Sequence, residues 1–288
     1  FHKADIADED SLAQVFKSDP PSAVVHFAAE THVDRSIISP KDFILSNVSG
    51  TANLLHLSLE HGVSRFVHLS TDEVYGELVS TSAGPFREED PLLPNSPYSA
   101  TKAGADMLVR AFSRTYGLPV IIVRPSNNYG PWQYPEKLLP LTIAKALLGE
   151  KIPVYGRGDN VRSWLFVEDC ARGVLALLDK GEPGEIYNIG SSEERPNLEV
   201  VRKVLSLLGK DKSLIEFVPD RPGHDFRYAV DAGKIMVQTG WQPGFDFERG
   251  LANTVTWYVA HTGWLMRKKK EAEGFVALLR ARYESMKR

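Results

Sequence analysis

The chain has 288 residues, of which 43% are hydrophobic and 25% are charged, and its formal net charge at pH 7 is −3. This composition is typical of a globular protein with one large domain and a smaller lobe, and the charge excludes a bulk attraction to nucleic acid or to membrane surfaces. No apolar run approaches the length of a membrane span, and the single Cys170 excludes an internal disulfide, so we expect a cytoplasmic protein.

Three short apolar runs, at 23–27, 66–69 and 120–124, predict buried parallel strands, because a helical stretch precedes each of them. This alternation predicts an α/β fold with a doubly wound sheet. The right-handed crossover rule then places the carboxyl ends of the strands on one side. We therefore expect Asn47 and Asn127 to lie near the end of the second strand.

The first chemical motif follows that second strand. Ser70 and Thr71 end the strand, and Asp72 and Glu73 come next, at the lip of the expected ligand crevice. A helix N-cap followed by acidic residues is the plainer structural explanation of this sequence. Residues 74–76, Val-Tyr-Gly, do not continue a helix, so we predict a carboxylate pair on a loop, with a chemical role.

The second motif is a tyrosine and a lysine four residues apart. Tyr98 and Lys102 accompany a helical pattern over 99–116, so both side chains leave the same helix face. A nearby ammonium favours the phenolate, and we expect it to lower the pKa of Tyr98 so that the phenol becomes a base. A solvated lysine beside an exposed aromatic is the alternative for an isolated pair. The neighbouring carboxylates favour an acid/base site.

Further blocks accompany these motifs in a fixed order, at 26–37, 126–131, 135–138, 162–169, 187–190 and 220–225. On these residues the chain, from Phe1 to about Trp264, resembles the extended short-chain dehydrogenase/reductase superfamily. Its Thr-Asp-Glu sequence resembles the nucleotide-sugar 4,6-dehydratases, above all those that act on dTDP-glucose. Epimerases of the superfamily usually have two small residues at positions 72 and 73. Decarboxylases and GDP-mannose dehydratases typically have Thr-Ser-Glu.

The resemblance implies a reaction in which Tyr98 takes the O4 proton of the glucose while the C4 hydride passes to NAD+. Glu73 then removes the C5 proton, Asp72 protonates the departing C6 hydroxyl, and the hydride returns to C6 to give the 4-keto-6-deoxy sugar. Thr71 would hydrogen-bond the O4 region, and Lys102 would also hold the nicotinamide ribose. Adjacent carboxyls repel each other's charge, so a neutral acid can coexist with an ionised base. Which of the two holds the proton is a property of the pair.

The resemblance also implies two sets of binding residues and no metal. The residues expected to bind NAD are Asp5, Ile6, Phe27, Ala28, Ala29, Thr31, Ser46, Tyr98, Lys102 and Asn127. The residues expected to bind the nucleotide sugar are Thr31, Asn128, Lys137, Leu138, Pro153, Tyr155, Arg162, Asn197, Arg221 and His224. The planar forks of the two arginines suit a diphosphate, although each residue taken alone would suit a surface salt bridge. Whether the substrate is dTDP-glucose or UDP-glucose stays open.

The expected domains follow from the same resemblance. Residues 1–130 and about 158–190 would form a Rossmann-like NAD-binding domain, and about 131–157 and 191–264 a nucleotide-sugar-binding lobe. Residues 265–288 read as a basic amphipathic tail with Phe275, Leu279, Tyr283 and Met286 at helical spacing. This tail either packs on its own domain or dimer mate, or docks a partner or an anionic surface.

One expected element is missing. A Rossmann-like site opens with a strand and a glycine-rich turn, but the nearest candidate, at 156–161, has no third glycine at the required spacing and is predicted to be a loop. Residues 1–6 match the third strand of the family. We therefore expect an N-terminally truncated enzyme and keep, as alternatives, a non-catalytic nucleotide-sugar binder or a related epimerase or decarboxylase.

Two helices, at 99–116 and about 47–61, carry more apolar residues than one sheet face needs. In the superfamily such helices form a four-helix dimer interface, so we expect a homodimer. Cys170 is expected to be a buried helix residue and not a nucleophile.

Overall fold

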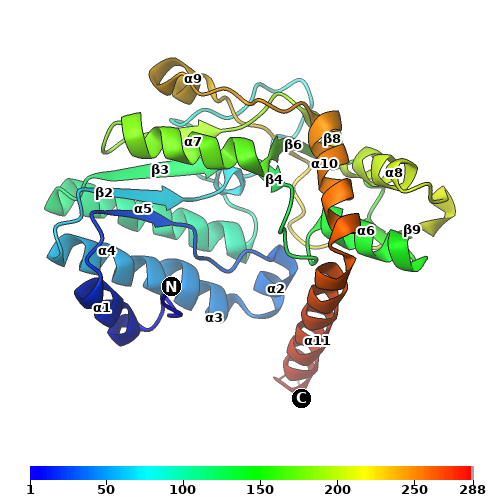
Figure 1. The fold of residues 1–288 in the computed structure, drawn as a ribbon, viewed down its shortest axis with the longest axis horizontal. Coiled ribbons are helices and arrows are strands. Elements are labelled where there is room, and N and C mark those ends of the chain that lie inside the picture. The colour runs from blue at the N-terminus through cyan, green and yellow to red at the C-terminus, as the bar shows by residue number, and fades with distance from the viewer. Residues whose placement is uncertain (287–288) are drawn as a thin grey trace.

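The computed structural model describes residues 1–286, with side chains described for residues 1–274. A larger lobe contains the parallel sheet predicted from the sequence, with helices on both of its faces (Figure 1). Its elements are α1 Glu9–Ser18, β1 Ala23–His26, α2 Val33–Ile38, α3 Pro40–Phe43, the π-helix η1 Ile44–Gly50, α4 Thr51–Glu60, β2 Arg65–Leu69, the 3-10 helix η2 Asp72–Tyr75, α5 Pro97–Tyr116, β3 Val120–Pro125, α7 Val167–Lys180, β7 Ile186–Ile189 and α9 Gly233–Thr239.

A smaller lobe holds the remaining elements. These are β4 Asn127–Tyr129, α6 Leu138–Leu148, β5 Ile152–Tyr155, β6 Val161–Phe166, β8 Glu194–Pro196, α8 Asn197–Leu207, η3 Lys212–Leu214, β9 Ile215–Val218, β10 Arg227–Tyr228, α10 Phe247–Ala260 and α11 Thr262–Met286.

The larger sheet has the strand order β1-β2-β3-β7, and all its neighbouring strands are parallel. The three strands predicted from the sequence are confirmed, and so is the α/β class. In this register Leu69 lies opposite Val123, so β2 and β3 end side by side. Their carboxyl ends therefore deliver the motifs that follow them to one edge of the sheet.

The sheet is buried on both faces because alternate strand residues point in opposite directions. Phe66 and Ile122 pack in one core with α1, α4 and α5. Val67 and Val123 pack in the other core with α7, where Cys170 is buried as predicted. These two cores fix the sheet between helix layers, so the edge at which the motifs converge is rigid.

The N-terminal segment differs from the expectation. Residues 1–5 form no strand, and β1, at the edge of the described sheet, pairs only with β2. Ile6 instead packs into the core beside α4, where its carbonyl accepts a 3.1 Å hydrogen bond from the Asn53 side chain. Asp8 then caps α1 by accepting from the backbone N–H of Ser11 at 3.2 Å.

The smaller lobe is built on two short sheets. One has the order β10-β6-β4, with β8 antiparallel to β6, and the other pairs β5 with β9. An aromatic core that includes Tyr129, Trp164 and Phe247 joins the first sheet to α6, α8 and α10. The strand β6 belongs to this lobe although it lies within 158–190, while α7 and β7 belong to the larger lobe. The proposed domain boundaries stay a prediction.

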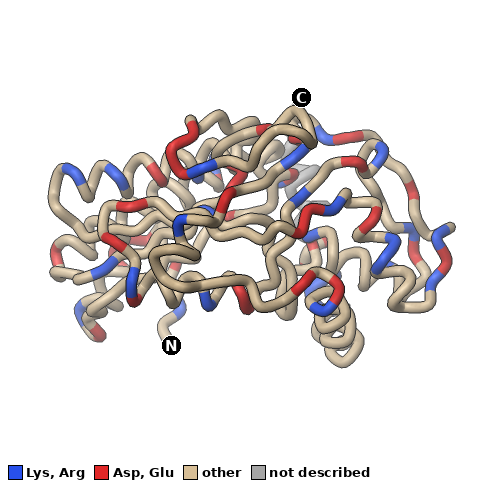
Figure 2. The backbone as a smooth tube through the Cα atoms, turned by 90° about the horizontal axis from the view of Figure 1, so that it is seen from above, with Lys and Arg blue, Asp and Glu red and all other residues tan. Residues whose placement is uncertain are grey.

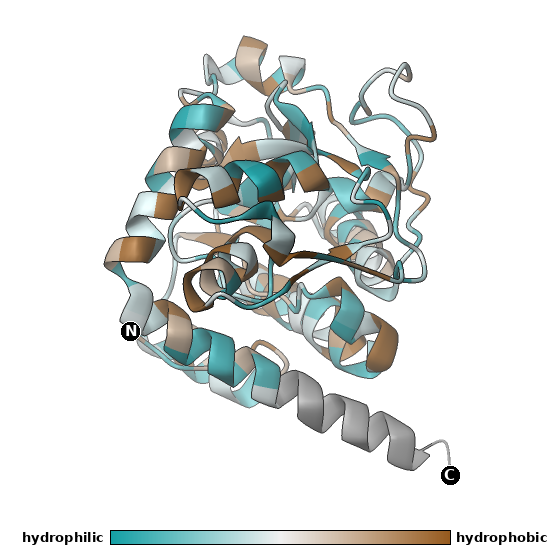
Figure 3. Ribbon diagram, turned by 90° about the vertical axis from the view of Figure 1, so that its right-hand side faces the viewer, coloured by the Kyte–Doolittle hydropathy of each residue, from teal (hydrophilic) through white to brown (hydrophobic). Residues whose placement is uncertain are grey.

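The first turns of the helix α11 pack on the body of the molecule, where Leu265 is buried (Figure 3). Lys269 attaches it to the smaller lobe through a 3.2 Å ion pair with Glu150, and also pairs with Glu273 at 2.8 Å on the same helix. The predicted apolar face of the tail, from Phe275 onward, lies outside the described side chains. Within the described residues, no helix is long and apolar enough to cross a membrane. Acidic and basic positions are interspersed along the chain (Figure 2).

Candidate active site

The carboxylate pair lies on a short turn at the end of β2. Thr71 caps the 3-10 helix η2, accepting from the backbone N–H of Glu73 at 3.3 Å. Gly76 ends the turn with φ +86°, where a Cβ would meet the carbonyl of Leu93. The pair therefore lies on a single helical turn and not on a loop as predicted. The N-cap and the carboxylate pair coexist, because Thr71 caps this turn and Asp72 and Glu73 are its first two residues.

The helix α5 supplies the tyrosine and the lysine. Ser96 and Ser99 form a capping box at its start, and the backbone N–H of Tyr98 donates to the Ser36 hydroxyl at 3.1 Å. Tyr98 and Lys102 are both buried. The Lys102 ammonium donates a 2.6 Å hydrogen bond to the carbonyl of Leu69, the last residue of β2. The alternative of an exposed aromatic and a solvated lysine is thus wrong.

The two carboxyls occupy different surroundings. Asp72 is 2% exposed, and burial, followed by the charge of Glu73, raises its pKa to about 8. Burial also raises the pKa of Glu73, but Arg221, Arg162 and Lys137 oppose this rise. Near neutral pH Asp72 therefore holds a proton, while the cations around Glu73 favour its ionised form. The acid role of Asp72 and the base role of Glu73, which the resemblance implied, stay a prediction that this division supports.

The expected effect of Lys102 on Tyr98 is not found. Burial, followed by the charge of Glu73, raises the pKa of Tyr98, and a hydrogen bond with Thr71 only partly opposes this rise. Burial also lowers the pKa of Lys102 to about 8, although Asp106 opposes the change. The prediction of a lowered Tyr98 pKa is therefore wrong for this structure, because helical spacing says nothing of the desolvation that both groups undergo.

A cavity of about 800 Å³ opens between the lobes beside these groups. Glu73 lines the cavity. The other four residues of the two motifs are buried and do not line it: Thr71, Asp72, Tyr98 and Lys102. The predicted substrate residues that line it are Asn128, Lys137, Leu138, Pro153, Tyr155, Arg162, Asn197, Arg221 and His224. Thr31 takes part through its carbonyl, which accepts from Lys137 Nζ at 2.5 Å. The structure thus gathers residues that are far apart in the sequence.

The two predicted arginines are held in this wall by different means. Arg162 donates to the carbonyl of Asp225 at 2.9 Å, and its guanidinium lies 4.3 Å from the centre of the Tyr228 ring. Arg221 approaches Asp34 at 3.6 Å, while its Nη1 is buried without a hydrogen-bond partner among the described residues. A buried guanidinium with an unused donor is suited to an anionic ligand.

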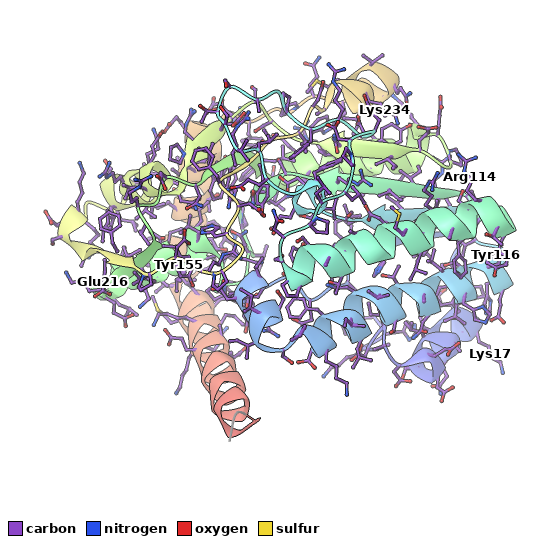
Figure 4. All side chains as sticks on the ribbon, turned by 180° about the vertical axis from the view of Figure 1, so that it is seen from behind. Lys17, Arg114, Tyr116, Tyr155, Glu216 and Lys234 are labelled. Atoms are coloured by element: carbon purple, nitrogen blue, oxygen red, sulfur yellow. The ribbon has the colours of Figure 1, made fainter. Side chains whose placement is uncertain are left out.

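Sequence reasoning missed several residues of the wall. Asp34, on α2, accepts from the hydroxyl of Tyr155 at 2.6 Å, and Figure 4 labels Tyr155 where the smaller lobe faces α2. Asp34 and Glu136 lie inside blocks that the sequence singled out, so their position was a usable signal. Tyr228 and Gln133 carried no such signal.

The residues predicted to hold the dinucleotide fall into separate groups. Asp5, Ile6 and Ser46 lie away from the cavity wall, whereas Phe27 and Ala28 directly follow β1 at the edge where the motifs converge. Ala29 follows them, and Asn127 lines the cavity.

The residues at this edge of the sheet suit a nicotinamide nucleotide. Phe27 is 59% exposed and offers an apolar surface at the end of β1. Asn127 Oδ1 is buried without a hydrogen-bond partner among the described residues, whereas the Ser70 side chain hydrogen-bonds with Asp106. The unused oxygen of Asn127 suits the carboxamide or a hydroxyl group of a ligand. The residues present therefore fit the nicotinamide end of the cofactor.

Comparisons with known proteins agree with this geometry. A family model described as GDP-mannose 4,6 dehydratase matches residues 1–254. The dTDP-glucose 4,6-dehydratase of Xanthomonas campestris pv. campestris is 50% identical and matches 92% of this chain and 80% of the relative. That of Escherichia coli is 46% identical and matches 93% of this chain and 81% of the relative.

Solved structures are similar as well. A dTDP-glucose 4,6-dehydratase double mutant from Streptomyces venezuelae with NAD bound has a TM-score of 0.88 and 47% identity, covering 92% of this chain and 81% of that one. A UDP-glucose 4-epimerase from Thermus thermophilus in complex with NAD has a TM-score of 0.85 and 30% identity, covering 90% and 84%.

Proposed function

The chain belongs to the GDP-mannose 4,6-dehydratase family, and from this premise we propose that it converts dTDP-glucose into the 4-keto-6-deoxy sugar with NAD as cofactor. The observation that carries the proposal is the meeting of a neutral Asp72 and a cation-facing Glu73 with the buried Tyr98 and Lys102. An oxidation and an elimination at adjacent carbons need these groups together.

The choice of dTDP-glucose within the family has two supports. The curated relatives at 46% to 50% identity carry the name dTDP-glucose 4,6-dehydratase. Residue 72 is an aspartate, as the resemblance implies for the hexose dehydratases, and not the serine typical of the GDP-mannose branch.

For the first half of the reaction, Tyr98 is the base that receives the O4 proton, with Thr71 beside it to orient the hydroxyl. Lys102 lies one turn further along α5, where its ammonium would hold the nicotinamide ribose. When bound, the nicotinamide would accept the hydride from C4 and later return it to C6. Because the pKa of Tyr98 is raised in this structure, its phenolate needs a positive charge nearby in the loaded site, and Lys102 on the same helix can supply one.

For the second half, Glu73 takes the C5 proton and Asp72 gives its proton to the leaving C6 hydroxyl. Glu73 reaches the cavity wall, where a base must meet the sugar, and the adjacent Asp72 is buried and stays protonated near neutral pH. Asp72 must be neutral at that moment because an ionised carboxylate has no proton to donate.

The cations of the wall connect substrate binding to this chemistry. Arg221, Arg162 and Lys137 favour the ionised form of Glu73, and they would bind the diphosphate of the substrate. When the diphosphate neutralises them, the pKa of Glu73 rises further, so the carboxylate becomes a stronger base while a smaller fraction of it is ionised. Diphosphate binding is thus coupled to the proton affinity of Glu73.

The test is an assay of the purified protein with NAD+ and either dTDP-glucose or UDP-glucose, in which the product is identified by NMR. A 4-keto-6-deoxy sugar formed preferentially from dTDP-glucose is the expected result. A C4 epimer, a pentose product or no turnover of either nucleotide sugar would contradict the proposal.

We propose further that the enzyme is a homodimer. The helices expected at the interface are α5 and the stretch at about 47–61, which forms the end of η1 and α4. Met107 on α5 is 46% exposed, and Ile44 and Leu45, at 50% and 45% exposure, lie on η1 just before that stretch. Such side chains on neighbouring helices suit a helical dimer contact. The cytoplasm is the proposed location, since the lone buried Cys170 requires no oxidising compartment.

A further inference from the structure

The face of α5 that carries Tyr98 and Lys102 continues for one more turn. Asp106 stands four residues beyond Lys102, on the same helix face, and is 0% exposed. It does not line the substrate cavity as described, so it does not serve the ligand directly. A fully buried carboxylate requires compensation by nearby charges or hydrogen bonds.

His68, on β2, and Arg124, on β3, supply that compensation. Arg124 makes the closest contacts. Its Nε donates to Asp106 Oδ2 at 3.0 Å, and its Nη1 donates to the hydroxyl of Tyr75 at 2.9 Å. Tyr75 belongs to η2, the turn that carries the catalytic carboxyls, and in turn donates to Asn188 at 2.8 Å. One buried guanidinium therefore joins the tyrosine-lysine helix to the turn of the acid and the base.

We propose that Asp106 is a positioning residue of the reaction, whose carboxylate, fixed by Arg124, is the counterion that keeps Lys102 charged. This inference rests on the proposed function, because the charge on Lys102 matters through the ribose and the tyrosine that it serves. Asp106 touches neither the substrate cavity nor the reacting atoms and acts through the charges of its neighbours, chiefly Lys102 and also Tyr98.

The other charged groups around this face do not fill the same role. His26 on β1 and His68 on β2 both sense the Lys102 charge, but burial lowers their pKa values to about 2 and about 4, so both are neutral near pH 7. His68 Nε2 lies 3.5 Å from Asp106 Oδ1.

The remaining groups either carry a positive charge or act elsewhere. Arg124, on β3, is a cation. Together with burial, Glu73 and Asp72, on η2, raise the pKa of Tyr98, the other titratable group of the α5 face, and Asp106 raises it as well. Burial lowers the pKa of Lys102, and Asp106 is the described group whose charge opposes this change.

The first test follows the oxidation step alone, as bound NADH formed in a single turnover at a series of pH values. In the wild-type protein the rate should fall as pH rises through about 8, where Lys102 loses its proton. In Asp106→Asn this alkaline limb should move to lower pH by about one unit, the usual effect of removing a close opposite charge. An unmoved limb would overturn the inference.

The matched control is Asp169→Asn. Asp169 is equally buried and also pairs with an arginine, Arg172, but it lies on α7 and accepts from the backbone N–H groups of Gly244 and Phe245 at 3.0 Å. This variant should lose stability and keep the wild-type alkaline limb. If both variants merely lower the rate without a change of profile, Asp106 has only a structural role.

A second readout does not need activity. Lysine Cε signals are followed by NMR during a pH titration, and Lys102 is assigned by the signal that Lys102→Met lacks. Its apparent pKa should be lower in Asp106→Asn than in the wild type. If Asp106→Asn does not fold, the double variant Asp106→Asn with Arg124→Met replaces the buried pair by neutral groups, which interiors commonly accept.

The double variant carries the same expectation for Lys102, and an unchanged Lys102 pKa in it would refute the counterion role. Absence of the 4-keto product with the wild-type protein would instead refute the proposed function, so the two failures are distinguishable.

Discussion

Replacing the catalytic acid should make this protein more stable. Asp72 is 2% exposed, and its Oδ2 has no hydrogen-bond partner among the described residues. Burial and the adjacent Glu73 raise its pKa from 3.8 to about 8. Asp72→Asn keeps the shape of the side chain but cannot ionise. The folded protein then no longer loses free energy by keeping this carboxyl protonated at pH values where the unfolded chain would ionise it.

The size of the effect follows from the pKa values of the two states. Between the unfolded value of 3.8 and the folded value of about 8, the native Asp72 binds a proton that the unfolded chain has released, so the free energy of unfolding falls as pH rises through this range. Near pH 7 the cost is up to about 4 kcal/mol, and it nearly vanishes below about pH 4. Asp72→Asn should therefore gain stability that grows with pH.

The assay is urea-induced unfolding of both proteins at several pH values between about 4 and 8. The control is Asp106→Asn, the same substitution at another fully buried position. Although burial alone would raise it, the pKa of Asp106 lies below its usual range because of His68 and Arg124. That carboxylate contributes stability above its unfolded pKa and loses it as pH falls, so its removal should destabilise the protein at neutral pH. A loss of stability in Asp72→Asn at pH 7 would refute the view that Asp72 is a buried neutral acid.

Three further predictions concern the site and the assembly. Glu73→Gln should let bound NADH accumulate while product formation slows by roughly 10²–10⁴-fold, whereas Tyr98→Phe should prevent NADH formation, because the two residues serve different steps. Single-turnover absorbance distinguishes the two variants. Accumulation of NADH in Tyr98→Phe would contradict the assigned roles. Arg221→Gln should weaken dTDP binding by about tenfold or more in calorimetry, since its buried guanidinium has an unused donor; unchanged affinity would exclude it from the diphosphate site. Light scattering at micromolar concentration should give the mass of a dimer, and a monomeric mass would contradict the proposed interface.

Local patterns predicted those parts of the structure that depend on neighbours in the sequence. The alternation of apolar runs and helical stretches identified the parallel strands, and the spacing of Tyr98 and Lys102 placed both on one helix face. The sign of the Tyr98 pKa shift was wrong, because desolvation depends on what the whole chain packs around a group. Asp106 continues the four-residue spacing of Tyr98 and Lys102, but the sequence does not predict its role, because its partners His68 and Arg124 come from β2 and β3. Its role required the fold.

The same burial that makes Asp72 an acid also limits the pH range in which the enzyme works. Asp72 must keep its proton for the elimination, and Lys102 must keep its charge for the oxidation, yet the pKa of each lies at about 8. The turnover rate at saturating substrate should therefore fall roughly tenfold or more between about pH 7 and pH 9, because the competent form of either group declines by that factor. Full recovery of the rate after return to neutral pH separates this titration from unfolding. A rate that stayed constant up to about pH 9 would mean that the interior is less dry than the structure indicates, and that neither group is held near the edge of its working protonation state.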